Sequence, residues 1–326
     1  MPFKAPRPVI APRPAKHEAP TRAPVALRKP GNVLDFDTHA APHRRSVTKH
    51  PGVPLAFARS ALFSVRERTS ERLTQHEVAA DGERYRLIYT GPQLHQQHSL
   101  LWQAIIAQAL DRQSTAQHDG SVRLVTSRPA LLRLMGKADD SASRRWLLLT
   151  LDELRLGTLK LDTPRHVFSH DLLGDYAYDR ETGALEISIS RQVLGLLADE
   201  VAVIDLGRKA RLGRNQLALW LHDFISTQTN GSTLPVAVQK LHRLCGSVQG
   251  IPQFRQRLRQ AADKLSAGED PVLIRWRIDE DDRFIFDKST TRVILLPAPV
   301  KEVANAISFH EEAIEAAKDQ RMRVLL

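Results

Sequence analysis

Arginine and glutamine side chains gather along one predicted helix, Ile251 to Leu265. Apolar residues such as Phe254 and Leu258 recur there with a helical period, which leaves the opposite face polar. That polar face carries Gln253, Arg255, Gln256, Arg257, Arg259, Gln260 and Lys264. Arginine can bind O6 and N7 of guanine, and glutamine can bind N6 and N7 of adenine. The pattern therefore favours a surface that binds DNA bases, and the alternative is a basic helix that only faces solvent.

Two more arginines belong to the segment that follows this helix. Alternating apolar residues predict a hairpin of Val272 to Ile278 with Arg283 to Phe286, around a turn at Asp279 to Asp282. Arg275 and Arg277 lie in its first strand. Because the tips of such hairpins meet the DNA backbone more often than the bases, we expect these two arginines to contact phosphates.

The elements before the polar helix complete a recognisable order. Asn215 to Thr227 is predicted as an amphipathic helix, and Leu234 to Leu244 as a short helix that Gly246 ends. Three helices followed by a hairpin are the order of a winged helix. In helix-turn-helix geometry the second helix of the pair enters the major groove, which is the place that the sequence gives to Ile251 to Leu265.

The first half of the chain shows a similar order with weaker signals. Helices are predicted over Gln93 to Leu110, from Ser127 to a C-cap at Gly136, and over Ser141 to Leu154. Strands are predicted at Leu159 to Leu161, Arg165 to Ser169 and Leu185 to Ile189. The last two strands are expected to pair as the hairpin, through Tyr176, Tyr178 and a turn at Glu181, Thr182 and Gly183.

The third helix of this half offers candidate DNA contacts near its start. They are Ser141, Ser143, Arg144 and Arg145. The acidic residues Asp139, Asp140, Asp152 and Glu153 would repel phosphate in the same region. A purely structural or dimerising role for this half therefore stays open as the alternative.

Positive charge is concentrated in two places. The chain of 326 residues has a net charge of +10, and residues 206–264 hold ten basic and two acidic side chains. Residues 1–54 hold ten basic and three acidic side chains together with 11 of the 19 prolines, which predicts a disordered basic tail. The tail is either a solvated leader or an aid to binding DNA or a partner.

Residues that could carry out catalysis do not form a recognised set. His95 and His98 lack a third metal ligand and are expected at the surface, and the tyrosines are expected to pack. The turn at Asp279 to Asp282 explains its acidic residues without a cation, and Cys245 is expected to be buried. No phosphate-binding loop of an NTPase is present. We therefore expect no catalytic residue, no metal and no cofactor, and a protein that is not an enzyme.

Composition also limits the location. No apolar run approaches the length of a membrane span, and a single cysteine cannot form an internal disulfide. The N-terminal segment is basic and interrupted by prolines, unlike a secretory signal. The sequence predicts a cytoplasmic protein that does not bind membranes.

Several stretches in the same order resemble the TrfA-type plasmid replication initiators. They are Arg59 to Phe63, Tyr89 to Leu94 with Trp102, Leu217 to His222, Leu241 to Ser247 and Phe254 to Leu258. The resemblance extends from about residue 57 to about residue 287. After Leu94 the family tends to be acidic, whereas this chain has His95, Gln96, Gln97 and His98.

This resemblance implies a protein that binds directly repeated DNA sites, called iterons, at a plasmid origin. It implies that the protein helps to open AT-rich DNA and recruits the host replication initiator and the replicative helicase. In proteins of this kind dimers are commonly less active for initiation than monomers, and some repress their own promoter. The resemblance places DNA binding on the helix that contains Phe254 to Arg257, and less directly on the helix that begins near Ser141.

The expected fold class is α+β, with two tandem winged-helix domains and a disordered basic tail. The predicted boundaries are 1–55 for the tail, 56–205 for a first domain in dimerisation and DNA contact, 206–290 for the main DNA-binding domain and 291–326 for a helical extension. A dimeric winged-helix transcriptional repressor is the alternative function. A nicking or strand-transfer enzyme whose motif is not recognisable is the third.

Overall fold

The computed structural model contains both helices and strands and belongs to the α+β class, as the sequence predicts. It describes residues 50–67, 71–81, 86–111, 115–116, 121–162, 167–197, 201–228 and 235–289, all of which belong to one unit of the chain. Almost all of the predicted tail and the whole predicted extension at 291–326 lie outside the described residues. Among the helices that are described, none combines the length and the apolar character that crossing a membrane requires.

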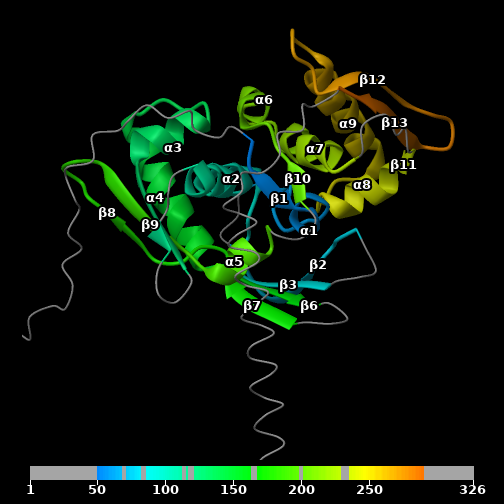
Figure 1. Ribbon diagram of the computed structural model, residues 1–326. Helices are drawn as coiled ribbons and strands as arrows, with labels where there is room; N and C mark the ends of the chain where they lie inside the picture. Colours follow the sequence, from blue (N-terminus) through cyan, green and yellow to red (C-terminus); the bar gives the residue numbers. More distant parts are fainter. Residues whose placement is uncertain are drawn as a thin grey trace, which may run out of the picture. The chain divides into compact units, whose positions relative to one another are not determined.

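The second half of the described chain has the element order helix, strand, helix, helix, strand, strand (Figure 1). Its elements are α7 (Gln216–Ser226), β11 (Val236–Ala237), α8 (Val238–Leu244), α9 (Ile251–Ser266), β12 (Leu273–Ile278) and β13 (Arg283–Lys288). The Asn215 side chain caps α7 by accepting a hydrogen bond of 3.0 Å from the Ala218 backbone NH. The apolar stripe of α9, from Phe254 to Leu265, is buried as its period predicts.

One boundary in this half differs from the prediction. Val236 and Ala237, expected inside the short helix, form strand β11 and pair with Phe284 and Arg283 of β13. A β-branched residue that directly follows Pro235 favours extended backbone over the first turn of a helix, and the helix begins only at Val238. The three strands lie in the order β11, β13, β12.

The first half repeats this arrangement with an insertion. Its elements are α2 (Gln96–Asp111), β4 (Thr115–Ala116), β5 (Val122–Ser127), α3 (Arg128–Leu134), α4 (Ser141–Arg155), β8 (Tyr176–Tyr178) and β9 (Ala184–Ile189). Strand β9 lies between β5 and β8, as β13 lies between β11 and β12. In both halves the strand between the first two helices therefore pairs with the last strand.

The insertion corrects the predicted hairpin of this half. Strand β7 (Val167–Asp171) pairs with β6 (Thr158–Asp162), not with β9, and β9 pairs with β8 and β5. The β6 and β7 hairpin joins β3 (Arg86–Pro92) and β2 (Arg72–Val78) in a separate sheet of order β2, β3, β6, β7. The turn before β9 is a tight one, because Asp179 Oδ1 accepts the backbone NH groups of Glu181 and Thr182 and Gly183 has a φ of +72°. This turn pairs β9 with the adjacent β8.

A matching helix end precedes α4 and α9. Gly136 after α3 and Gly246 after α8 have φ values of +65° and +69°, as their predicted C-cap role requires. The backbone NH groups of Lys137 and Ser247 return to carbonyls of the last helical turn, at 2.8 Å and 3.2 Å. The residue that follows each glycine is therefore fixed in direction.

Short elements connect the two halves. They are β1 (Gly52–Pro54), α1 (Leu55–Ala58), α5 (Arg191–Gly195), β10 (Val201–Val203) and α6 (Leu206–Arg211). Strand β1 pairs with β10. The Trp220 indole NH of α7 donates to the Ser60 carbonyl at 3.0 Å, so the segment after α1 packs against the second half.

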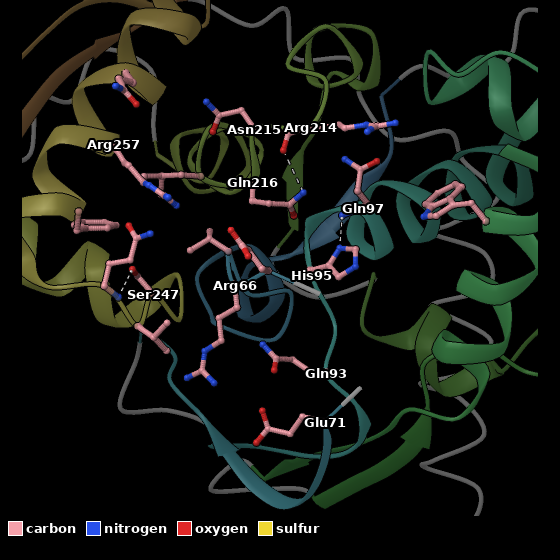
Figure 2. A pocket seen from close by; sticks show the side chains of 18 of the residues that line it. Arg66, Glu71, Gln93, His95, Gln97, Arg214, Asn215, Gln216, Ser247 and Arg257 are labelled. Atoms are coloured by element: carbon pink, nitrogen blue, oxygen red, sulfur yellow. Dashed lines mark hydrogen bonds between the residues drawn. The ribbon is translucent and has the colours of Figure 1, made fainter. Parts of the chain in front are cut away.

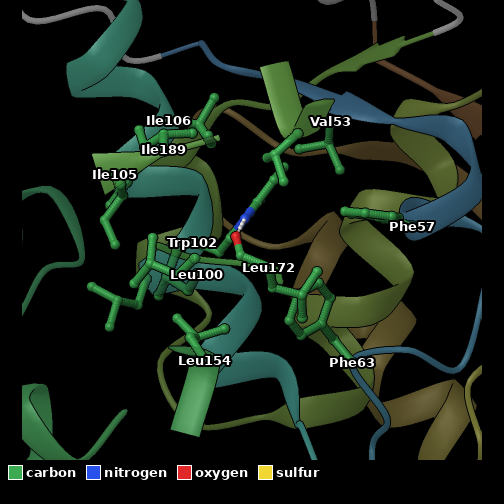
Figure 3. Close-up of a cluster of buried hydrophobic side chains, with 14 of the residues drawn as sticks. Val53, Phe57, Phe63, Leu100, Trp102, Ile105, Ile106, Leu154, Leu172 and Ile189 are labelled. Atoms are coloured by element: carbon green, nitrogen blue, oxygen red, sulfur yellow. Dashed lines mark hydrogen bonds between the residues drawn. The ribbon is translucent and has the colours of Figure 1, made fainter. Parts of the chain in front are cut away.

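Buried side chains form two apolar clusters, one in each half. The first extends from Val53 to Leu206 and is centred on α2, where the Trp102 indole NH donates to the Leu172 carbonyl at 3.1 Å (Figure 3). The second extends from Leu212 to Phe286. The boundary between the clusters falls within the α6 and α7 region.

A buried polar cluster lies at this boundary. The Lys209 ammonium group of α6 is fully buried and contacts Asp223 of α7 together with Ser99 and Gln103 of α2, the last at 2.9 Å. Burial lowers the pKa of Lys209, and the charge of Asp223 opposes that shift. Since α2 belongs to the first cluster and α7 to the second, this ion pair ties the two halves together.

Candidate nucleic-acid interface

The polar face of α9 is open to solvent. Gln253, Gln256, Arg257, Gln260 and Lys264 are exposed, while Phe254 and Leu258 below them are buried. Phe254 is also held edge-on against the His242 ring of α8, at 5.0 Å between ring centroids. The amides and cations of α9 therefore project from a packed support, which a surface that binds DNA bases requires.

Arg255 differs from its neighbours on α9. Its Nε donates to Asp282 Oδ1 at 2.7 Å, and only a third of its side chain is exposed. The hydrogen bond from Arg255 holds the pKa of Asp282 below its ordinary range, and the charges of Arg255 and Arg259 add to that shift. Asp282 lies in the hairpin turn and has a φ of +56°. Sequence reasoning placed Arg255 among the exposed cations and missed its carboxylate partner.

The hairpin arginines lie at the surface on β12. Arg275 is 81% exposed and pairs with Asp287 across the hairpin, at 2.8 Å from Nη2 to Oδ2. Arg277 is exposed as well. Both are therefore accessible to a partner.

The start of α4 brings its four candidates together, but its acidic neighbours occupy some of them. Asp140 is the N-cap and accepts the Ser143 backbone NH at 2.7 Å. Asp139 pairs with Arg128 at 2.8 Å and with Arg144 at 3.2 Å. The Arg128 hydrogen bond lowers the pKa of Asp139, so this carboxylate stays charged and partly neutralises Arg144. Ser141 and Arg145 are exposed.

The two candidate helices, α4 and α9, both line one groove of about 1240 Å³ (Figure 2). Phe254, Arg257 and Gln260 of α9 line it on one side, and Ser143 and Trp146 of α4 line it on the other. Figure 2 shows Arg257 projecting from α9, opposite His95 and Gln97 at the start of α2. A smaller pocket, lined by Gln253, Gln256, Arg257 and Gln260, continues along α9. Arg255 and Arg259 line neither of these spaces, so the polar face of α9 divides into a groove side and a hairpin side.

Cations that were not among the predicted contacts also line the groove. They are Arg66, Lys137 and Arg214. Lys137 lies over the Trp146 ring, with Nζ 4.4 Å from the ring centroid, and Arg66 Nε donates to the Gly246 carbonyl at 3.0 Å. The acidic residues Glu67, Glu71 and Asp140 line it too, so the groove is mixed in charge with a small excess of cations.

Amide side chains hold the α7 side of the groove in place. Gln97 Nε2 donates to the Gly213 carbonyl at 3.2 Å, and Gln216 Oε1 accepts the Gln96 backbone NH at 3.0 Å. These bonds join α2 to the start of α7 across the boundary between the two halves. They fix the loop that carries Arg214.

The two histidines are not at the surface as predicted. His95 and His98 are 8% and 1% exposed, and their rings pack edge to face. His98 Nδ1 accepts the His95 backbone NH at 3.1 Å, so Nε2 carries the proton and donates to Glu153 Oε2 at 2.7 Å. Glu153 was expected to repel phosphate, but it accepts this hydrogen bond instead. The i and i+3 spacing indicated a shared helical side and could not tell which side was buried.

Other candidates for chemistry are packed as expected. Cys245 is buried, and burial raises its pKa to about 12, which disfavours the reactive thiolate. Tyr89 is buried, and its hydroxyl donates to the Pro92 carbonyl at 2.8 Å. In the part of the chain that the structure describes, no group of three or more His, Cys, Asp and Glu side chains is placed to hold a metal ion.

Comparisons with known proteins add a likeness in structure. No family model matches the chain, and no curated protein matches it in sequence. The crystal structure of domains 2 and 3 of RctB is similar, with a TM-score of 0.50 and 13% identity over 73% of this chain and 99% of that one. A second crystal structure of RctB domains 2 and 3 gives a TM-score of 0.46 at 13% identity, over 70% of this chain and 95% of that one. At this identity the likeness shows a shared fold, and membership of the TrfA-type family does not follow from it.

Proposed function

We propose that this protein is a DNA-binding replication initiator. The observation that carries the proposal is the exposed arginine and glutamine face of α9, which follows a two-helix turn and lies beside a hairpin with exposed arginines. The fold of domains 2 and 3 of RctB, itself a replication initiator, supports the same function.

The repeated strand order supports a pair of winged helices. In each half the sheet connects the strand before the helix pair with a terminal hairpin, in the orders β5, β9, β8 and β11, β13, β12. We assign α4 and α9 as the two helices that enter the major groove. Two such helices in successive grooves would cover about 20 base pairs, because one turn of DNA is ~10.5.

The target that fits this arrangement is a set of direct repeats at a plasmid origin. Binding to repeats in one direction would place several copies of the protein in line beside the AT-rich DNA that is opened. We further propose that the bound protein recruits the host replication initiator and the replicative helicase, and that it exchanges between monomer and dimer. It needs no cofactor and acts as a binder, not as an enzyme.

A selection experiment tests the proposal. Purified full-length protein is mixed with sheared source DNA, and the bound fragments are sequenced and mapped by cleavage protection. Several tandem repeats of about 20 base pairs would support an initiator, whereas a single palindrome would favour the transcriptional repressor. Metal-dependent conversion of supercoiled DNA to open circles, without a preferred site, would favour the nicking enzyme instead.

Two variants of α9 and one control variant test whether α9 carries the binding. Gln256→Ala and Arg257→Ala lie on the exposed face of α9, and Lys160→Gln lies on strand β6, outside the groove. The α9 variants should weaken binding to the selected site, and Lys160→Gln should leave it unchanged. Equal binding by all three would remove α9 from the proposed interface.

A further inference from the structure

We propose that Lys137 and Arg214 form a phosphate-binding site in the groove, which holds a DNA phosphodiester between α4 and α9. This inference rests on the proposed function, because it assumes that duplex DNA is the partner. It adds a contact in the region between the two helices that enter the major groove.

Both cations are held in place by backbone geometry. Lys137 follows Gly136, and its backbone NH returns to the Leu132 carbonyl at 2.8 Å. Its side chain lies over Trp146 and is partly buried. Arg214 follows Gly213, whose φ is +63° and whose carbonyl accepts the Gln97 amide. The two side chains therefore reach the groove from loops that are fixed on opposite sides of the boundary between the halves.

Neither cation is neutralised in the described ranges. Some helical arginines have carboxylate partners, as Arg128 of α3 has Asp139 and Arg208 of α6 has Asp270. Lys137 and Arg214 form no ion pair with any described carboxylate. The charge of Asp140 raises the pKa of Lys137, but Asp140 Oδ1 already accepts the Ser143 backbone NH as the helix cap.

The two cations act on each other unfavourably. Burial lowers the pKa of Lys137, and the positive charge of Arg214 lowers it further. Two neighbouring cations that form no ion pair repel each other in the free protein, and a bound anion reduces that repulsion. The pair is therefore arranged for a negatively charged ligand.

The surroundings favour a phosphodiester in a duplex over a small free anion. The groove has a volume of about 1240 Å³, far more than one phosphate occupies, and it continues along Gln253 and Gln256 of α9. Arg257 and Gln260 on the α9 side and Ser143 on the α4 side line the same space. A DNA backbone that follows the groove would pass Lys137 and Arg214 between the two helices.

The number of phosphates bound can be measured by the salt dependence of binding. Each phosphate neutralised adds ~0.9 to the slope of log affinity against log salt, which corresponds to about eightfold in affinity at ~0.1 M salt. The full-length protein is titrated with the selected repeat and with a random duplex, over ~50 to ~200 mM salt. The variants are Lys137→Gln, Arg214→Gln and the double variant, with Lys160→Gln as the matched control for loss of one charge.

We expect the double variant, which removes the site for one phosphate, to bind about eightfold more weakly and to lower the slope by ~0.9 on both duplexes, and each single variant to reduce both by less. Lys137→Arg, which keeps the charge, should keep the slope. Lys160→Gln should behave as the unchanged protein. If Lys137→Gln does not fold, Arg214→Gln alone tests the site, because Arg214 is exposed.

The outcomes separate this inference from the proposed function. If the protein without substitutions binds the repeat and the variants show the same salt slope, the proposed phosphate site is wrong and DNA binding stands. A loss confined to the selected repeat would also overturn it, since phosphate contacts weaken binding to all sequences alike. An unchanged protein that binds neither duplex overturns the proposed function itself.

Discussion

Helices α4 and α9 occupy equivalent places in their halves but present different surfaces. Each follows a short helix that ends in a left-handed glycine, Gly136 or Gly246, and each precedes strands that close a sheet of the same order. On α9 the exposed face is made of amides and cations, with Asp263 its one exposed acid. On α4 the cation Arg144 is paired with Asp139, and Asp152 and Glu153 lie in the later turns.

The difference shows that two helices in equivalent places of a repeated fold can contribute unequally to one surface. Free arginines and glutamines can exchange hydrogen bonds with bases, whereas an arginine held by a carboxylate must first lose that partner. We infer that α9 provides most of the sequence preference and that α4 adds contacts near its first turn.

The largest expected effect comes from breaking the buried ion pair of Lys209 and Asp223 at the boundary between the two halves. Lys209→Ala should lower the free energy of unfolding by about 3–5 kcal/mol, because it leaves the Asp223 carboxylate buried without its partner. Unfolding in urea measures the loss. The double variant Lys209→Met with Asp223→Leu is the control, and it should recover most of the stability because no charge is left buried. A loss below about 1 kcal/mol in Lys209→Ala would contradict the ion pair.

The same ion pair contributes to the fall in the free energy of unfolding at low pH. Burial acts to raise the pKa of Asp223, but the charge of Lys209 and the contact with His222 outweigh it, so the pKa of Asp223 lies below its ordinary value. A carboxyl group with a lowered folded pKa adds stability above its unfolded pKa of ~3.9 and loses that contribution as the pH falls further. Asp223→Asn should therefore flatten the fall in stability below pH ~4, measured by urea unfolding at a series of pH values.

The second prediction compares the two helices directly. Arg257→Ala on α9 should cost about 1–3 kcal/mol in binding to the selected site and should relax the sequence preference. Arg145→Ala on α4 should cost less, about 0.5–1 kcal/mol, with similar losses on specific and random duplexes. Competition titrations with single-base variants of the site measure both. Equal effects on sequence preference would contradict the unequal division between α9 and α4.

Local patterns in the sequence predicted the framework of this interface. The apolar period of α9 identified its buried stripe, and Gly136 and Gly246 marked the ends of the short helices. These features depend on neighbours within one or two turns, which a sequence displays directly. The α+β class and the exposed face of α9 follow from them.

Contacts between distant segments were not predictable in the same way. Strand β7 pairs with β6 and not with β9 as expected, and β6 in turn pairs with β3, about seventy residues earlier in the chain. Lys209 counted toward the basic segment, yet it is fully buried because Asp223, Ser99 and Gln103 surround it. Lys137 and Arg214 lie far apart in the chain, and only the fold brings them to one groove.

The third prediction concerns Asp282, which holds Arg255. Asp282→Asn keeps a residue type that accepts the left-handed backbone at this position and removes the negative charge. We expect affinity for random DNA to rise, because one repulsive charge leaves, while discrimination between sites falls by up to about 1 kcal/mol because Arg255 is less firmly placed. Binding of paired specific and random duplexes measures the two changes. A parallel rise on both duplexes would mean that Asp282 does not position Arg255.

The smallest expected effect would make α4 more like α9. Asp139→Asn releases Arg128 and Arg144 from their shared carboxylate, so the start of α4 gains net positive charge. Affinity for random DNA should rise by about two- to threefold, with little change in sequence preference, because the freed cations meet phosphates and not bases. Asp175→Asn, which releases Arg155 at the other end of α4, is the matched control and should change binding less, since that end lines no part of the groove. The Arg128 hydrogen bond lowers the pKa of Asp139, so the charge persists below the ordinary aspartate range, and the effect of Asp139→Asn should be constant from pH 8 down to about pH 5. An effect that appeared only near the upper end of this range would assign the change to another titrating group.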